Sequence, residues 1–215
     1  MVLKWVVYLV PAVAATILPI IVIQAPSNAA LAIWFVGVPL ACIIFLNASK
    51  AEIRFSWSLF REDVSRAMRF LVPFAGYHAL VVFVLTYFRR GSGSSPGLDL
   101  NFLLSNIGEE LLFRATLIPA MELLERRLFD SLNQKRIVAI TALAFGLCHL
   151  GAVIEAPSPL MRYAAIQNVL AATVIGIFLG NLYVRTRNFP SVLAIHWWIN
   201  LEDGLLGLLA YSLLG

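Results

Sequence analysis

Long apolar segments follow one another through nearly the whole chain, at residues 2–23, 29–48, 70–88, 102–121, 137–154, 162–184 and 189–214. A helix needs about 20 mostly apolar residues to cross the hydrocarbon core of a bilayer, so these segments predict about seven transmembrane helices. The composition agrees, since 60% of the residues are hydrophobic and 13% are charged, whereas soluble domains average about 45–50% and about 25%. We therefore expect an all-α, polytopic integral membrane protein with a single transmembrane domain over residues 1–215.

Residues 49–69 connect two of the expected spans and have an amphipathic pattern. Arginines alternate there with apolar residues at helical spacing, which are Ile53, Trp57, Phe60, Val64 and Met68. This pattern predicts one amphipathic helix that lies on the membrane surface. The inward face of an ordinary cytoplasmic helix explains the pattern equally well.

Lys and Arg are distributed unevenly among the loops. With the N-terminus inside, the outer loops hold Arg89, Arg90 and Arg162, and the other loop and tail cations all lie on the inner side. Because cytoplasmic loops are enriched in Lys and Arg, we expect the N-terminus inside and the C-terminus outside, in a bacterial cytoplasmic membrane. The basic residues are scattered over short loops, so we expect membrane lipids and no nucleic acid as partners.

Ionisable and amide side chains gather inside the spans of the second half of the chain. Such groups are costly in a bilayer and face one another or a functional cavity. They include Asn106, Glu109, Glu110 and Arg114 in the span 102–121, beside the polar Ser105, His149 in the span 137–154, Gln167, Asn168 and Asn181 in the span 162–184, and His196, Asn200, Glu202 and Asp203 in the span 189–214. This half should therefore contain the functional site.

Several of these residues are four positions apart, which places them on one face of a helix. Glu110 and Arg114 can form an ion pair, Ser105 stacks with Glu109, and His196 stacks with Asn200. A carboxylate with an imidazole can deprotonate a water molecule, and a second imidazole with an amide can stabilise an oxyanion. The same Glu and His residues could instead bind Zn²⁺. Asp203 shares the face of His196, but we place it outside the site.

Three short motifs occur in order on separate apolar segments: EExxxR at Glu109–Arg114, FxxxH at Phe145–His149 and HxxxN at His196–Asn200. Together they resemble the CPBP (Abi) family of intramembrane proteases, which includes the CAAX prenyl proteases. The resemblance covers a catalytic core at about residues 100–205 and leaves residues 1–99 as variable N-terminal helices.

The resemblance implies a role for each matching residue. Glu109 is the general base and holds the attacking water with His149, while His196 and Asn200 form the oxyanion hole. Glu110 and Arg114 brace the first glutamate, and Phe145 packs beneath the water. The resemblance to the prenyl protease implies a metal-independent glutamate mechanism, so we expect no cofactor and no metal ligand, with Zn²⁺ as the alternative.

The expected substrate is a protein or peptide with a membrane-associated tail, such as a C-terminal sorting signal, a leader peptide or a bacteriocin. If the span 102–121 begins at the outer surface, the rise per residue of a helix places Glu109 in the outer half of the bilayer. The same reasoning places His196 nearer the inner side. Three alternatives stay open: a metal-dependent protease, a noncatalytic immunity or scaffold protein, and a proton-coupled transporter. The oligomeric state is not specified by any pattern.

Overall fold

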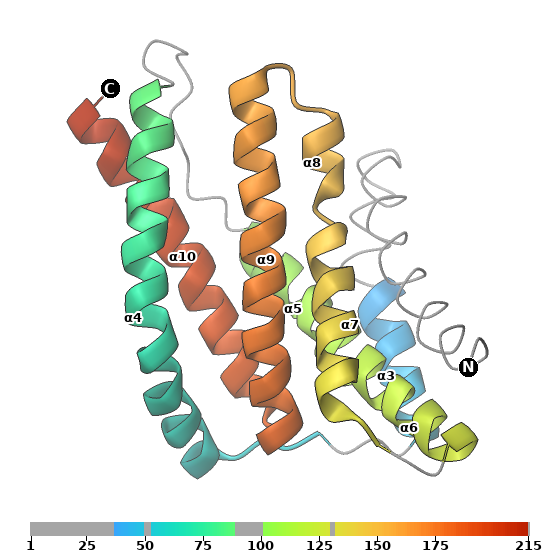
Figure 1. Cartoon of the computed structure of the whole chain (residues 1–215). Coiled ribbons are helices and arrows are strands. Elements are labelled where there is room, and N and C mark those ends of the chain that lie inside the picture. Colours follow the sequence, from blue (N-terminus) through green and yellow to red (C-terminus); the bar gives the residue numbers. More distant parts are fainter. Residues whose placement is uncertain (1–36, 50–52, 89–100, 130–131, 215) are drawn as a thin grey trace.

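The computed structural model describes residues 37–49, 53–88, 101–129 and 132–214 of the chain (Figure 1). Among these residues the regular structure is helical, apart from one isolated bridge between Arg54 and Asn188. The helices are α3 (Val38–Ser49), α4 (Trp57–Phe88), α5 (Asn101–Glu110), the π-helical segment η2 (Leu111–Leu117), α6 (Ile118–Phe129), α7 (Gln134–Leu147), α8 (Leu150–Ile154), α9 (Pro159–Thr186) and α10 (Phe189–Leu214). The all-α prediction is therefore confirmed for the described part of the chain.

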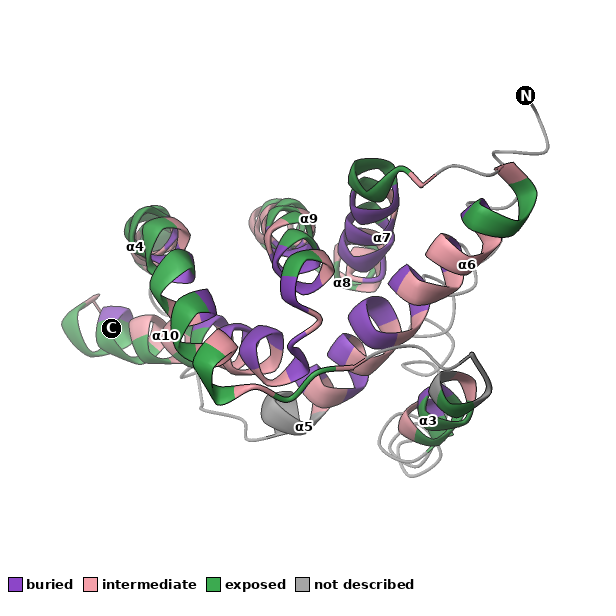
Figure 2. Cartoon of the chain, turned by 90° about the horizontal axis from the view of Figure 1, so that it is seen from below, coloured by how far each residue is buried: buried purple, intermediate pink, exposed green. Residues whose placement is uncertain are grey.

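The helices form two layers, with the apolar core between them. In Figure 2, α4, α9 and α7 lie in one row and α10, α5 and α6 lie in the other, and the buried faces of the two rows are turned toward each other. The core includes Phe74 from α4, Phe113 from η2, Phe145 from α7, Leu179 from α9 and Ile199 from α10. The polar residues of the three sequence motifs lie on elements of both layers.

Three described helical segments are long and apolar enough to cross a membrane: Trp57–Phe88, Gln134–Ile154 and Pro159–Thr186. They correspond to three of the expected spans, which supports an integral membrane protein. The expected span 2–23 and most of 29–48 lie outside the described residues, and the span 102–121 falls within the continuous series α5–η2–α6. The expected count of about seven is not confirmed by these findings.

The amphipathic segment at 49–69 differs from its prediction. From Trp57 onward it is the first part of α4, which continues without a break to Phe88. No separate interfacial helix therefore exists within the described part of this segment. Its buried positions include Asp63 and Ala67, whereas the apolar Trp57 stays largely exposed. The helix even continues through Pro73, which membrane helices tolerate better than soluble ones.

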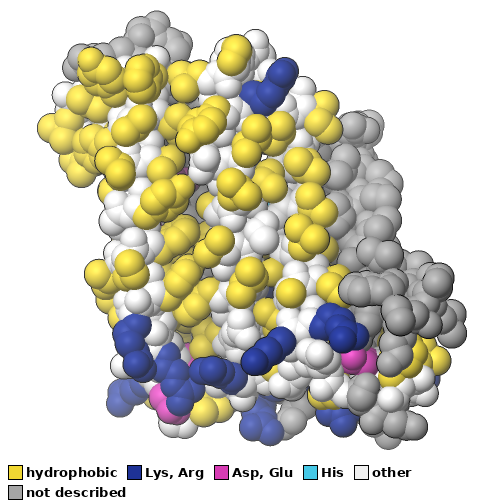
Figure 3. Space-filling model, in the orientation of Figure 1, with side chains coloured by type: hydrophobic (Ala, Val, Ile, Leu, Met, Phe, Trp, Pro, Cys, Tyr) yellow, Lys and Arg dark blue, Asp and Glu magenta, His cyan; other side chains and the backbone are white. Residues whose placement is uncertain are grey.

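Lys and Arg side chains gather at one end of the bundle, the lower end in Figure 3. This is the end where α9 meets α10 and where α6 leads toward α7 (Figure 1). The series α5–η2–α6 begins well below the upper ends of α4 and α9, and α6 descends to the basic end (Figure 1).

Small residues bring α7 and α9 close together. A Cβ atom added to Gly176 would lie 3.0 Å from Cα of Ala142, and one added to Gly180 would lie 3.0 Å from Cγ1 of Val138. Small residues allow membrane helices to approach closely where lipid provides no hydrophobic driving force. This contact fixes the position of the end of α7, which carries Phe145 and Cys148.

Asn188 joins the beginning of α4 to the turn between α9 and α10. Its amide oxygen accepts from the backbone N–H of Ser56 at 3.0 Å, and its nitrogen donates to the backbone oxygen of Ser56 at 3.1 Å and to Ser191 Oγ at 2.6 Å. The preceding residue, Arg187, ends α9 in a left-handed conformation with φ of 54°. The turn thus sets the direction in which α10 leaves α9.

Candidate active site

A continuous helical series carries the EExxxR motif into the core. The α-helix α5 ends at Glu110, and the π-helical segment η2 follows at once and contains Arg114. Such π segments are uncommon and occur frequently at functional sites, because the wider turn changes the directions of side chains. Both glutamates therefore lie at the junction between two helical geometries.

Glu110 is the centre of a buried ionic network. Its Oε1 atom lies 2.8 Å from Nδ1 of His196 and 3.2 Å from Nη1 of Arg114. The Glu110 side chain is 0% exposed, that of Arg114 is 2% exposed and that of His196 is 5% exposed. The predicted pairing of Glu110 with Arg114 is confirmed, and His196 on α10 is the third member. The network links α10 to the α5–η2 junction.

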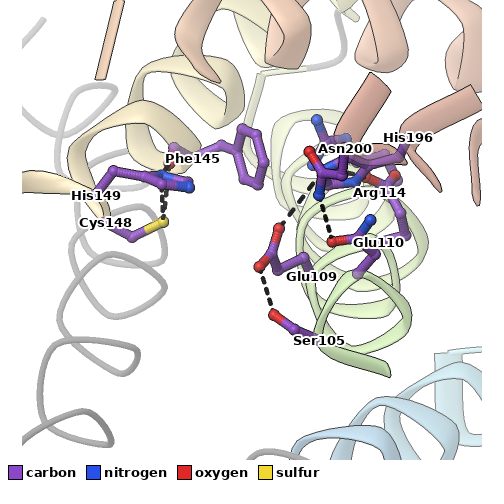
Figure 4. Close-up of polar contacts among 10 residues, drawn as sticks. Ser105, Glu109, Glu110, Arg114, Phe145, Cys148, His149, His196 and Asn200 are labelled. Atoms are coloured by element: carbon purple, nitrogen blue, oxygen red, sulfur yellow. Dashed lines mark hydrogen bonds and ion pairs between the residues drawn. The ribbon is translucent and has the colours of Figure 1, made fainter. Parts of the chain in front are cut away.

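Glu109 has a different environment from its neighbour. Its side chain is 17% exposed, and one carboxylate oxygen accepts a hydrogen bond from Ser105 Oγ at 2.8 Å. The other oxygen lies 3.8 Å from Nε2 of His196. Of the two adjacent carboxylates, Glu109 is the one that an incoming molecule can reach, while Glu110 holds the surrounding groups in place (Figure 4).

Asn200 is held in place by Asn106, a residue for which the sequence motifs predict no role. Its Nδ2 atom donates to Oδ1 of Asn106 at 2.9 Å. Asn106 is buried and lies one turn before Glu110, so this contact is a second link between α10 and α5. The signal for it was present in the sequence, since Asn106, Glu110 and Arg114 are spaced four apart, as are His196 and Asn200.

Phe145 is the aromatic centre of the site. The guanidinium carbon of Arg114 lies 4.3 Å from its ring centroid, a distance at which a cation is attracted to the ring face. The ring also makes edge contacts with His149 at 5.3 Å, His196 at 5.8 Å and Phe113 at 5.2 Å between centroids. Phe145 therefore contacts both histidines of the motifs and the buried cation.

His149 is the predicted site residue that stands apart. Its Nδ1 atom lies 3.0 Å from the backbone oxygen of Phe145 and 3.5 Å from Sγ of Cys148. Within the described part of the chain, no hydrogen bond or ion pair connects it to either glutamate, and Figure 4 shows its ring separated from the Glu109 carboxylate. The structure thus brings together Glu109, Glu110, Arg114, His196 and Asn200, and joins His149 to them through Phe145.

A second group of ionisable residues lies outside this site. His78 on α4 has its Nε2 atom 3.3 Å from Oδ1 of Asp203 and its Nδ1 atom 4.0 Å from Oε1 of Glu202, both on α10. Asp203 therefore faces His78, although its spacing had placed it on the face of His196. In the described ranges, no group of three or more His, Cys, Asp or Glu side chains has an arrangement suited to a metal ion.

The comparisons with known proteins agree with the motifs. A family model described as "Rce1-like: Type II CAAX prenyl endopeptidase Rce1-like" matches residues 80–201, which is more than half of the chain. The matched region includes α5, η2, α6, α7, α8, α9 and the part of α10 that carries His196 and Asn200. Searches of curated proteins and of solved structures each found no match.

Proposed function

The chain belongs to the Rce1-like family of type II CAAX prenyl endopeptidases, and from this premise we propose that it is an intramembrane endopeptidase that uses Glu109 and His149 to activate water. The family supports a CAAX-type endopeptidase in an integral membrane protein. The observation that carries the proposed mechanism is the contrast between the accessible Glu109 carboxylate and the fully buried Glu110 network beside it.

Glu109 acts as the general base in this mechanism. A water molecule held by the Glu109 carboxylate loses a proton to Glu109 as its oxygen attacks the carbonyl carbon of the substrate, and His149 is joined to the site through Phe145. The Ser105 hydroxyl, which donates to one Glu109 oxygen at 2.8 Å, leaves the other oxygen to accept this proton. Glu109 then transfers the proton to the leaving amine, so that the carboxylate is restored when the peptide bond breaks.

His196 and Asn200 stabilise the oxyanion that forms on the attacked carbonyl. Nδ1 of His196 lies 2.8 Å from Oε1 of Glu110, and this contact orients the ring so that Nε2 lies on the side of Glu109, where an N–H on Nε2 would donate to the oxyanion. One proton of Asn200 Nδ2 is used by Asn106, and its second proton is available for the oxyanion. Donors that are held in position by buried partners need little reorganisation as charge develops, which is the main source of such stabilisation.

The substrate in this proposal is a membrane-associated protein or peptide, with a prenylated CAAX tail, a C-terminal sorting signal, a leader or a bacteriocin as candidates. The basic end of the bundle supports an orientation in which that end faces the cytoplasm of a bacterial cell, with the N-terminus inside and the C-terminus outside. The partly exposed Glu109 carboxylate suits a peptide bond presented by a tail held in the membrane.

The test compares Glu109→Gln with Glu155→Gln, a matched change of an exposed glutamate outside the site. Purified protein is incubated with prenylated CAAX peptides, unprenylated peptides and transmembrane-tail substrates, and the products are identified by mass spectrometry. We expect Glu109→Gln and His149→Ala each to lower the rate at least a hundredfold, because general-base catalysis contributes about 10²–10⁴-fold, while Glu155→Gln retains full activity.

Two outcomes separate this proposal from its alternatives. Full biological function of Glu109→Gln in cells would contradict the protease and favour a noncatalytic immunity or scaffold role. Loss of cleavage on strong chelation, with recovery when Zn²⁺ is added back, would favour the metal-dependent version.

A further inference from the structure

A hollow lies between α4 and α9 at the basic end of the bundle. Its volume is about 540 Å³. Its lining is Arg66 and Arg69 from α4, and Phe178, Asn181, Leu182 and Arg185 from α9. Figure 3 shows Lys and Arg side chains gathered over this region. Three guanidinium groups from two helices therefore surround one concave surface.

The positive charge of the hollow is only partly balanced. Arg66 forms an ion pair with Glu62 one turn earlier, whereas Arg69 and Arg185 have no ionic partner among the described residues. Asp63 is near in sequence, but its side chain is buried and does not line the hollow. The Asn181 amide nitrogen donates to the backbone oxygen of Ile177 at 2.8 Å, so the guanidinium groups are the main free donors.

Apolar surface continues from the hollow toward the middle of the membrane. Phe178 stacks on Phe70 of α4 with 4.1 Å between ring centroids, which closes the space between the two helices above the arginines. Beyond this pair, Val174 on α9 and Val72 on α4 are exposed on the outer surface. A ligand seated here would have its charged end among the arginines and apolar chains along α4 and α9.

We propose that this hollow binds the phosphate headgroup of an anionic phospholipid from the cytoplasmic leaflet. Arginine is suited to the task because its planar group forms paired, charge-assisted hydrogen bonds with phosphate oxygens. The basic end of the bundle lies at the level of the cytoplasmic headgroups. The hollow belongs to the layer of α4 and α9, whereas α5, which carries Glu109 and Glu110, lies in the other layer (Figure 2). The lipid is therefore distinct from the substrate.

The headgroup joins α4 to α9 at the basic end of the bundle, where few other polar contacts connect these two helices. The site goes beyond the proposed protease function and does not depend on it, since Arg69 and Arg185 lie outside the catalytic motifs. The lipid should hold the cytoplasmic ends of the two helices together and thereby stabilise the bundle, because a ligand that binds only the folded state raises its stability.

The test uses the full-length protein in phosphatidylcholine-containing micelles and titrates phosphatidylglycerol, with the bound lipid counted by native mass spectrometry. The variant is R69Q/R185Q and the matched control is R126Q/R127Q, which removes two exposed arginines of α6 outside the hollow. Each basic group near an anionic surface contributes about a fivefold factor in affinity. We therefore expect the variant to bind phosphatidylglycerol roughly thirtyfold more weakly, and the control to stay within about twofold of wild type.

A second measurement follows thermal unfolding as phosphatidylglycerol is added. The wild type and R126Q/R127Q should gain stability, and R69Q/R185Q should gain little while keeping the wild-type unfolding temperature in phosphatidylcholine alone. If the double variant does not fold, R69Q and R185Q tested singly should each weaken binding roughly fivefold.

Several results would overturn the proposal. Equal losses in R69Q/R185Q and R126Q/R127Q would mean that the arginines attract lipid only through the general charge of this end. Displacement of the lipid by an equal concentration of inorganic phosphate would mean that the hollow binds a free anion. Unchanged lipid binding combined with a raised KM for a cleaved substrate would assign the hollow to the substrate tail.

Discussion

Arg114→Met tests whether the buried network holds the two layers of the bundle together. The Arg114 side chain is 2% exposed, with Nη1 3.2 Å from Oε1 of Glu110 and its guanidinium carbon 4.3 Å from the centroid of the Phe145 ring. Methionine keeps much of the volume but removes the charge. The fully buried Glu110 carboxylate then keeps His196 as its ionic partner within the described residues.

The expected loss in the free energy of unfolding follows from this burial. Removing one partner of a buried ion pair costs about 3–5 kcal/mol, because the remaining charge has lost part of its compensation in a poorly hydrated site. The lost cation–π contact with Phe145 is part of this cost, at about 2 kcal/mol for a desolvated pair. The double variant E110Q/R114M removes both charges, so its loss should be about 2 kcal/mol smaller than the sum of the two single losses.

The assay is equilibrium unfolding in phosphatidylcholine micelles with a denaturing detergent, followed by circular dichroism. Arg66→Met is the matched control, because Arg66 pairs with Glu62 at the same i,i+4 spacing but the two side chains are 41% and 54% exposed. An exposed pair contributes about 0–1 kcal/mol, so this control should change stability very little. The reasoning is refuted if Arg114→Met is as mild as Arg66→Met, or if the losses in E110Q/R114M are additive.

Two further changes test how the site is positioned. Gly146→Ala should destabilise the protein by about 1–3 kcal/mol and lower activity, because its new Cβ would lie 2.9 Å from the backbone oxygen of Val169 on α9. Gly76→Ala is the control, because no atom lies within 4 Å of its new Cβ; it should leave activity unchanged and gain about 0.5–1 kcal/mol of helix stability. Thermal unfolding compares the two variants. Equal changes in stability for Gly146→Ala and Gly76→Ala would contradict the close approach of α7 and α9. Asn188→Ala removes the three side-chain hydrogen bonds of this residue to Ser56 and Ser191. At about 1 kcal/mol per bond, it should lower the free energy of unfolding by about 3 kcal/mol in denaturant unfolding. A change below about 0.5 kcal/mol would show that the turn does not depend on Asn188.

The contacts within one helix could be predicted because the helical repeat places residues four apart on the same face. This is why the ion pair of Glu110 with Arg114 and the hydrogen bond of Ser105 with Glu109 agree with the sequence analysis. The amphipathic prediction for 49–69 was wrong about the helix ends, since the described part contains no Gly or Pro between Trp57 and Pro73 that would end a helix. Composition alone therefore could not separate a surface helix from the first turns of a longer one.

His149 shows where the helical repeat no longer predicts the position of a side chain. The apolar segment 137–154 predicted one continuous helix, but α7 ends at Leu147 and α8 begins at Leu150. His149 lies in the break between these helices, and its Nδ1 atom stays close to the backbone oxygen of Phe145. The direction of the His149 ring depends on this break between α7 and α8. No change in the composition of the sequence predicts the break.

By itself the sequence determined that the chain is helical and membrane-spanning, that its ionisable and amide groups gather in the spans of the second half, and which of them share a helix face. Apolar length and the 3.6-residue repeat are local properties. Only the tertiary structure decided that His196 meets Glu110 rather than Asp203, that Asn200 pairs with Asn106, and that Asp203 turns to His78. Contacts between helices depend on tilt, rotation and depth, and these are set by how side chains such as Gly146, Gly176 and Phe145 pack against distant parts of the chain.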